Sequence, residues 1–238
     1  MKNQYFGDIN DYRKYGLLRA ITLNTDWNFL VAWMLTPDDG GPDGKKREFL
    51  EAPDTYERYD YPLFWGLVDL LRSPTQPSVS LIEGSDLLPG ASYYSAVVPD
   101  TRRERDEWYD GLLRAAKGAD LVFLDPDNGI EVKSKPVGRK GSSKYVTWDE
   151  IEGLWNAGSS LLIYQHFPRE RRDPFIQRIA AALRKRTGAD FVKAFRTSHV
   201  LFLLAAQDLH VHNFAGNISL LADRWNGQIK VVGLANNR

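Results

Sequence analysis

The fifteen-residue stretch 119–133, ADLVFLDPDNGIEVK, constrains the fold of this chain more than any other segment. It begins with the apolar run Leu121 to Leu124, which is typical of a strand buried on both faces of a parallel sheet. The run ends in Asp125-Pro126-Asp127-Asn128-Gly129, where proline cannot donate to a ladder and Asn-Gly readily turns. The carboxylates of Asp125 and Asp127 are therefore expected at the carboxyl end of a central strand, where open α/β sheets bind ligands.

Helical and strand-like patterns alternate along the rest of the chain. Apolar residues at helical spacing predict helices over residues 11–21, 61–72, 102–117, 148–155, 173–186 and 217–225. Apolar runs predict strands over residues 29–35, 79–82, 121–124 and 160–164, a closing antiparallel pair at 191–195 and 200–205, and a short strand at 229–232. This order predicts an α/β fold with a mainly parallel sheet covered on both faces. Because no repeat or linker interrupts residues 1–238, we expect a single domain.

Composition narrows the classes of function. Lys+Arg and Asp+Glu both total 31, so a nucleic-acid surface would have to be a local patch. The chain has no cysteine, which excludes disulfides, zinc–thiolate sites and a thiol nucleophile. His210 and His212 have no carboxylate cluster beside them in the sequence, so no metal site is expected. The polar start and the lack of a membrane-length apolar run predict a cytoplasmic protein without a membrane partner.

Glycine or polar turns follow several of the expected strands. The first strand leads into the loop 36–45, whose glycines would let backbone N–H groups approach a ligand. The second ends at Glu83, where Rossmann-like domains place an acidic residue for ribose hydroxyls. The strand 160–164 leads into Gln165-His166-Phe167-Pro168-Arg169, in which His166 is a candidate base and Arg169 a candidate phosphate contact.

The amino-terminal segment Gly7-Asp8-Ile9-Asn10-Asp11-Tyr12-Arg13-Lys14-Tyr15 carries a resemblance to a known family. It resembles the motif G-N-x-x-D-x-x-K-H of RlmJ-type methyltransferases, which are class I S-adenosylmethionine-dependent enzymes acting on adenine N6 of large-subunit ribosomal RNA. Tyr15 stands where that family has histidine. The family's V-E-x-x-D pattern corresponds to Glu83 and Asp86, and its D-P-P-Y motif to Asp125-Pro126-Asp127-Asn128. The order of these motifs is kept from Gly7 to about Pro168.

The resemblance implies a three-layer Rossmann-like methyltransferase fold with an antiparallel strand near the carboxyl terminus. It implies S-adenosylmethionine as the cofactor, with its binding residues drawn from four segments: Gly7, Lys14 and Tyr15; Thr36, Gly40 and Gly41; Glu83 and Asp86; and Asp125. It also implies that Asp125 accepts a hydrogen bond from the amino group being methylated, with Asp127 and Asn128 beside it in the catalytic turn. An RNA or DNA acceptor is the expected partner, contacted by His166, Phe167 and Arg169.

The catalytic turn departs from the family, because Asp127 and Asn128 replace the second proline and the aromatic residue of D-P-P-Y. That aromatic residue stacks on a flipped base, and asparagine cannot do so. Phe167, Tyr164 and Tyr15 are the candidate replacements.

Two further interpretations stay open. The altered turn is also what a binding protein would show if it had kept the fold and lost the chemistry. Alternatively, Asp127, Glu131 and Lys133 echo the P-D…(D/E)-x-K pattern of nucleases, in which two carboxylates hold a divalent cation and a lysine assists the attacking water.

Overall fold

The computed structural model describes residues 1–41, 44, 46–72 and 76–235, and within them a central sheet organises the chain. This sheet has seven strands: β1 (Phe29–Ala32), β2 (Ala91–Tyr94), β3 (Leu121–Leu124), β6 (Ser160–His166), β7 (Phe191–Arg196), β8 (Val200–Ala206) and β9 (Lys230–Val232). Their spatial order is β2-β1-β3-β6-β8-β7-β9. The neighbours β2, β1, β3 and β6 pair in parallel, whereas β8 pairs antiparallel with both β6 and β7, and β9 antiparallel with β7. The expected α/β class, with a mostly parallel sheet and antiparallel strands near the carboxyl terminus, is confirmed.

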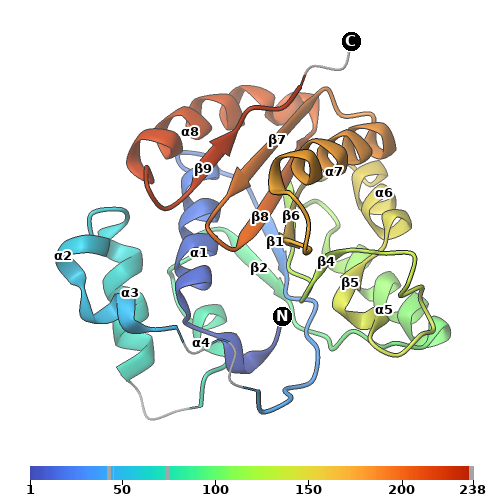
Figure 1. Cartoon of the computed structure of the whole chain (residues 1–238), viewed down its shortest axis with the longest axis horizontal. Coiled ribbons are helices and arrows are strands. Elements are labelled where there is room, and N and C mark those ends of the chain that lie inside the picture. Colours follow the sequence, from blue (N-terminus) through green and yellow to red (C-terminus); the bar gives the residue numbers. More distant parts are fainter. Residues whose placement is uncertain (42–43, 45, 73–75, 236–238) are drawn as a thin grey trace.

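Helices cover both faces of this sheet (Figure 1). Helices α1 (Ile9–Ile21), α3 (Tyr61–Arg72) and α8 (Val211–Arg224) pack on one face, and α5 (Arg102–Ala115), α6 (Trp148–Asn156) and α7 (Arg172–Thr187) on the other. Successive strand residues point to opposite faces, so Leu121 and Phe123 of β3 join the first core while Val122 and Leu124 join the second. The fully apolar strand is thus explained by burial on both sides.

Short elements connect this framework. They are the 3₁₀ helices η1 (Asn3–Tyr5), η2 (Glu48–Glu51), η3 (Ser142–Lys144) and η4 (Asp208–His210), the helical turns α2 (Pro53–Tyr56) and α4 (Ser80–Glu83), and a two-stranded parallel ladder of β4 (Gly129–Ile130) with β5 (Tyr145–Val146). None of the helices within the described ranges combines the length and apolar character that crossing a bilayer requires.

The predicted helices are all present, and their caps explain where two of them begin. Asp8 caps α1 by accepting hydrogen bonds from the backbone N–H groups of Asn10 and Asp11. Thr147 and Glu150 form the capping box expected at the start of α6. Helix α8 begins at Val211, six residues before the predicted start at Asn217.

The second predicted strand is wrong. Residues 79–82 belong to the helical turn α4 and its cap, held by hydrogen bonds from Val79 N to Asn3 Oδ1 (3.1 Å) and from Ser80 N to Ser78 Oγ (3.2 Å). A run of so few apolar residues fits a helical turn as well as a strand, and these contacts decide in favour of the helix. The strand beside β1 is β2, a half-exposed edge strand that lacks a buried apolar run.

Candidate functional site

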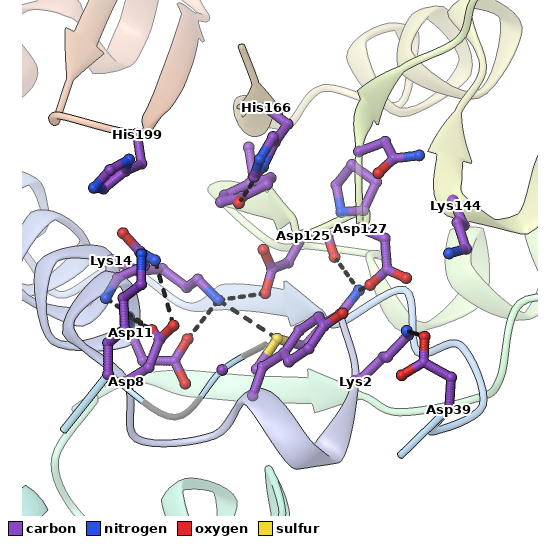
Figure 2. Close-up of a pocket in the computed structure, with 18 of the residues that line it drawn as sticks. Lys2, Asp8, Asp11, Lys14, Asp39, Asp125, Asp127, Lys144, His166 and His199 are labelled. Carbon is purple, nitrogen blue, oxygen red and sulfur yellow. Dashed lines mark hydrogen bonds and ion pairs between the residues drawn. The ribbon is translucent and has the colours of Figure 1, made fainter. Parts of the chain in front are cut away.

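A cavity of about 570 Å³ opens at the carboxyl ends of β3 and β6, beside the start of α1 (Figure 2). It is lined by side chains from the amino-terminal segment, α1, the turn after β3, the end of β6 and the turn between β7 and β8. The position agrees with the rule that open α/β sheets bind ligands at this edge. Its volume lies in the range of small-molecule sites.

Lys14 lies at the floor of this cavity between two carboxylates. Its Nζ is 2.8 Å from Asp11 Oδ1 and 2.6 Å from Asp125 Oδ2, and all three side chains are only 3% exposed. Helix α1 brings Asp11 and Lys14 together because residues three apart share a helix face. Burial alone would lower the pKa of Lys14, but the charges of Asp11 and Asp125 outweigh burial and raise it. Lys14 therefore remains a cation, which makes it a charge partner for Asp125 and unsuited to act as a base.

Aromatic rings and a thioether complete the surroundings of this ammonium group. The ring centroids of Tyr15, Trp33 and Tyr164 lie 5.8–5.9 Å from Lys14 Nζ, and Met1 Sδ lies 3.8 Å from it. Rings at this distance attract a cation electrostatically. The floor of the cavity is thus built to hold positive charge.

Asp127, the second carboxylate of the turn, is also engaged. Its Oδ1 lies 2.6 Å from the amino group of Met1, and its Oδ2 accepts a hydrogen bond of 2.7 Å from Thr36 Oγ1. The amino group of Met1 further donates to the backbone oxygens of Met34 and Asp125. Met34 carries φ +47°, a left-handed conformation that is uncommon outside glycine. The first residue thereby joins the ends of β1 and β3.

Carboxylates outnumber cations at the floor. Asp8, Asp11, Asp39, Asp125 and Asp127 are opposed by Lys2, Lys14 and the amino group of Met1, and burial lowers the pKa of that amino group. Burial and the neighbouring charge of Asp11 raise the pKa of Asp8 to about 6. For Asp127, burial acts in the same direction but the amino group of Met1 outweighs it, so the pKa of Asp127 is lowered. An excess of negative charge in a site of this depth favours a ligand that carries positive charge.

Two imidazoles and a phenol form the other side of the cavity. His166 ends β6, His199 lies in the turn between β7 and β8, and both line the cavity with Tyr164. The Tyr164 hydroxyl is hydrogen-bonded to His166 Nδ1 at 3.1 Å. Figure 2 shows His166 and His199 across the cavity from Asp8 and Asp11.

The structure brings together part of the predicted site. Lys14, Asp125, Asp127, Asn128 and His166 line the cavity. Gly7 and Thr36 support it from outside, because Gly7 N donates to Asp11 Oδ2 and Thr36 holds Asp127. These residues come from segments far apart in the sequence, as the motif order had implied.

Other predicted contacts lie elsewhere. Glu83 accepts hydrogen bonds from Trp33 Nε1 and Ser95, and neither it nor the exposed Asp86 lines the cavity. The reason is the misassigned strand: Glu83 ends a helical turn, so its carboxylate reaches the end of β2 from outside the sheet. Tyr15 is fully buried behind Lys14 and packs edge-on against Trp33.

The backbone amides of Gly40 and Gly41 are not free. Gly40 N donates to Gln4 Oε1 and Gly41 N donates to Asp39 Oδ1, so the N–H groups expected to hold a ligand are already bonded. Of the loop, Asp39 and Gly44 line the cavity, and residues 42, 43 and 45 lie outside the described ranges. Beyond β6, Phe167 packs against Phe175 and Arg169 is exposed, and neither lines the cavity.

The residues of the nuclease pattern are not assembled around the cavity. Glu131 Oε1 accepts a hydrogen bond of 2.8 Å from Trp148 N, which places it at the start of α6. Lys133 is exposed, and neither residue lines the cavity that Asp127 lines. No group of three or more possible metal ligands occurs in the part of the chain that the structure describes. The geometry therefore speaks against this interpretation.

Several lining residues were not found from the sequence: Met1, Lys2, Tyr5, Asp39, Lys46, Glu48 and His199. Met1 to Tyr5 belong to no motif, and His199 sits in a turn whose neighbours in space are set by the antiparallel pairing of β7 with β8. Asp11 carried a signal as a matched position of the amino-terminal motif, and Asp39 belongs to the loop 36–45 that was expected to approach a ligand.

Comparison with known proteins adds no relative. No model of a known protein family matches the chain, and no curated protein is similar enough to be reported as a match. Inferences about function accordingly rest on the site itself.

Proposed function

We propose that this chain is an S-adenosylmethionine-dependent methyltransferase acting on an amino group. The observation that carries the proposal is the 2.6 Å contact between Lys14 and Asp125 at the floor of the cavity. The resemblance implies that Lys14 holds the methyl donor and that Asp125 binds the amino group to be methylated. Methyl transfer requires the donor and the acceptor to lie side by side. Lys14 and Asp125, which the resemblance assigns to the donor and the acceptor, are in contact. The finer assignments, a methyltransferase fold and a cytoplasmic location, belong to the same proposal.

The chemistry of the cavity fits such a donor. S-adenosylmethionine carries a sulfonium and an ammonium group, and the floor offers an excess of carboxylates together with aromatic faces. Asp8 and Asp11 are the residues that would hold these cationic groups, and Lys14 is the partner for the donor's carboxylate. When bound, the cofactor would supply a methyl group activated by the positive sulfur. Glu83 takes no part, because it lies outside the cavity.

The chain's own residues would position the acceptor. Burial raises the pKa of Asp125, and the nearby charges of Lys14 and the Met1 amino group oppose that shift. Paired with Lys14, the carboxylate of Asp125 would accept a hydrogen bond from the acceptor amine and orient the nitrogen. Methylation leaves one proton too many on that nitrogen, and we assign the acceptance of this proton to His166, which lines the cavity. Tyr164 is the one of the three candidate aromatics that lines the cavity, so we assign to it the contact with a planar base. An RNA or DNA base remains the proposed acceptor.

A second candidate, a binding protein without transfer activity, has one observation in its favour. Asp127, which replaces the second proline of D-P-P-Y, is tied to Met1 and Thr36 rather than left open for an acceptor. Such a protein would bind the donor or its product and methylate nothing.

The two candidates are separated by measuring transfer of a labelled methyl group from S-adenosylmethionine to total RNA and to DNA. A methyltransferase incorporates label, and Asp125→Asn reduces incorporation by at least about tenfold, since a charged hydrogen bond contributes about 1.5–3 kcal/mol. Asp86→Asn is the matched control: it removes the same charge from an exposed residue outside the cavity and should leave incorporation unchanged. No incorporation by the unaltered chain, with donor binding intact, would favour the binding protein.

A further inference from the structure

Cationic and imidazole side chains gather around His199 at the edge of the cavity. His166, His199 and Lys46 line it, and they come from the end of β6, the turn between β7 and β8, and the segment before η2. Arg13 of α1 and Arg172 of α7 lie near His199. Burial lowers the pKa of His199, and the charges of Lys46, Arg13, Arg172 and His166 lower it further. We call these five residues, Arg13, Lys46, His166, Arg172 and His199, the cationic rim.

In the part of the chain that the structure describes, no carboxylate lies within ion-pair distance of the permanent cations of the rim, and the charge of Asp8 acts on Arg13 from farther away. Within the described ranges, Arg13, Lys46 and Arg172 form no ion pair: Arg13 donates to the neutral amide of Gln228, and Arg172 lies over the ring of Phe167. Nearby arginines are paired, since Arg178 contacts Glu170 and Arg196 contacts Asp173. Asp8, whose pKa lies near 6, and the exposed Glu48 also line the cavity.

Like charges gathered at the mouth of a cavity repel one another unless a counter-ion joins them. Three permanent cations exceed what the single carboxylate of a methyl donor requires. A phosphate group carries more negative charge and several acceptor oxygens, and arginine and lysine are its usual partners. The cavity thus has an acidic floor for a cation and a basic rim for a phosphate.

We propose that the cationic rim binds a phosphate group of the methyl acceptor and so places the acceptor's amine over Asp125. This inference rests on the proposed function, because it assigns the phosphate to the acceptor. The phosphate can belong to a nucleotide or to a nucleic-acid strand, and the test distinguishes the two.

The test uses the full chain and a double variant of two exposed rim residues, Lys46→Gln with Arg172→Gln. Its matched control, Arg102→Gln with Lys117→Gln, removes the same charge from two exposed positions, the first residue of α5 and the turn just after it, that form no ion pair within the described ranges. The probes are a labelled single-stranded RNA, AMP and inorganic phosphate, measured by fluorescence anisotropy and by competition against the RNA. Calorimetry with S-adenosylhomocysteine is run on the same proteins.

The rim variant should weaken RNA binding by about tenfold or more and reduce the slope of log affinity against log salt by about 1.4, at about 0.7 per lost phosphate contact. The control should change neither value. Competition by AMP and inorganic phosphate would show that the site binds the phosphate group itself. Competition by RNA alone would show that it binds a nucleic-acid strand. Either result supports phosphate binding by the cationic rim.

Three results would overturn the proposal: no binding of any phosphate probe, equal weakening in the rim and control variants, or loss of S-adenosylhomocysteine binding in the rim variant. The last would mean that the rim holds the donor's carboxylate, and the proposed function would survive it. Conversely, rim-dependent phosphate binding by a chain that never binds S-adenosylhomocysteine would support the phosphate site and remove the proposed methyl transfer.

Discussion

The ammonium group of Lys14 lies 2.6 Å from the carboxylate of Asp125, although 111 residues separate them in the sequence. Helix α1 supplies one partner and the turn after β3 the other. The contact is almost fully shielded from water, so breaking it would leave an uncompensated charge in the protein interior.

Removing Lys14 should therefore destabilise the chain strongly. Lys14→Met is expected to lower the free energy of unfolding by about 3–5 kcal/mol, measured by urea denaturation. Adding Asp125→Asn should restore part of the loss, because it removes one of the stranded carboxylates. Arg72→Gln breaks an exposed ion pair with Asp69 and should stay within about 0.5 kcal/mol of the unaltered chain. If the Lys14→Met variant were as stable as the Arg72→Gln control, the buried contacts of Lys14 with Asp11 and Asp125 would not stabilise the fold as expected.

Asp8 should make the chain more stable as the pH falls. Its pKa is raised from 3.8 to about 6, so the folded state binds the proton more tightly than the unfolded state. Stability from this group is lost as the pH rises from about 4 to about 6, by up to about 3 kcal/mol. Asp8→Asn keeps a capping oxygen and removes the titration. Urea denaturation across this range should show a slope that differs between the two proteins, and parallel slopes would argue against a perturbed Asp8.

His210 should act in the opposite direction. It is buried, its Nδ1 is hydrogen-bonded to Ser160 Oγ at 2.8 Å, and burial lowers its pKa below 6.5 despite Asp120 nearby. The unfolded state therefore takes up the proton first, and stability falls as the pH drops through 6.5. His210→Gln should flatten this dependence, whereas His212→Gln, at an exposed position of α8, should leave it intact. Identical pH profiles for the two variants would rule out His210 as its source.

Position 7 requires glycine because its backbone is left-handed and because Leu71 leaves no room for a side chain. Its φ is +84°, and an added Cβ would lie 2.6 Å from Leu71. Gly118 has a similar φ of +78° with no atom within 4 Å, so Gly118→Ala measures the backbone effect alone, about 1–2 kcal/mol. Gly7→Ala should cost more than this and should also weaken donor binding, because Gly7 N holds Asp11. Equal losses of stability, measured by thermal unfolding, would show that Leu71 moves aside.

The parts of the fold that were predictable are those with strong local signals. The apolar run of β3 and the capping box of α6 each depend on residues close together in sequence. The edge strand β2 gave no such signal, because Ala91-Ser92-Tyr93-Tyr94 is half-exposed and pairs only on one side with β1. Because residues 79–82 were predicted to be a strand, Glu83 was expected at the carboxyl edge of the sheet and was therefore included in the predicted site.

The candidate site was predictable where a motif fixed both residue and position, as for Lys14 and Asp125. It was not predictable where tertiary contacts alone place a side chain. His199 reaches the cavity only because β7 and β8 pair, and Met1 only because its amino group bonds to Met34 and Asp125. The amides of Gly40 and Gly41 seemed available in the sequence, yet Gln4 and Asp39 had already bonded them.

The most direct test of the account is calorimetric titration of the chain with S-adenosylhomocysteine, repeated on Asp8→Asn and Asp86→Asn. Saturable binding is predicted for the unaltered chain and for Asp86→Asn, with affinity reduced in Asp8→Asn because a carboxylate facing the ligand has been lost. Absence of binding to the unaltered chain would contradict the proposed donor site, and so would equal binding by all three proteins.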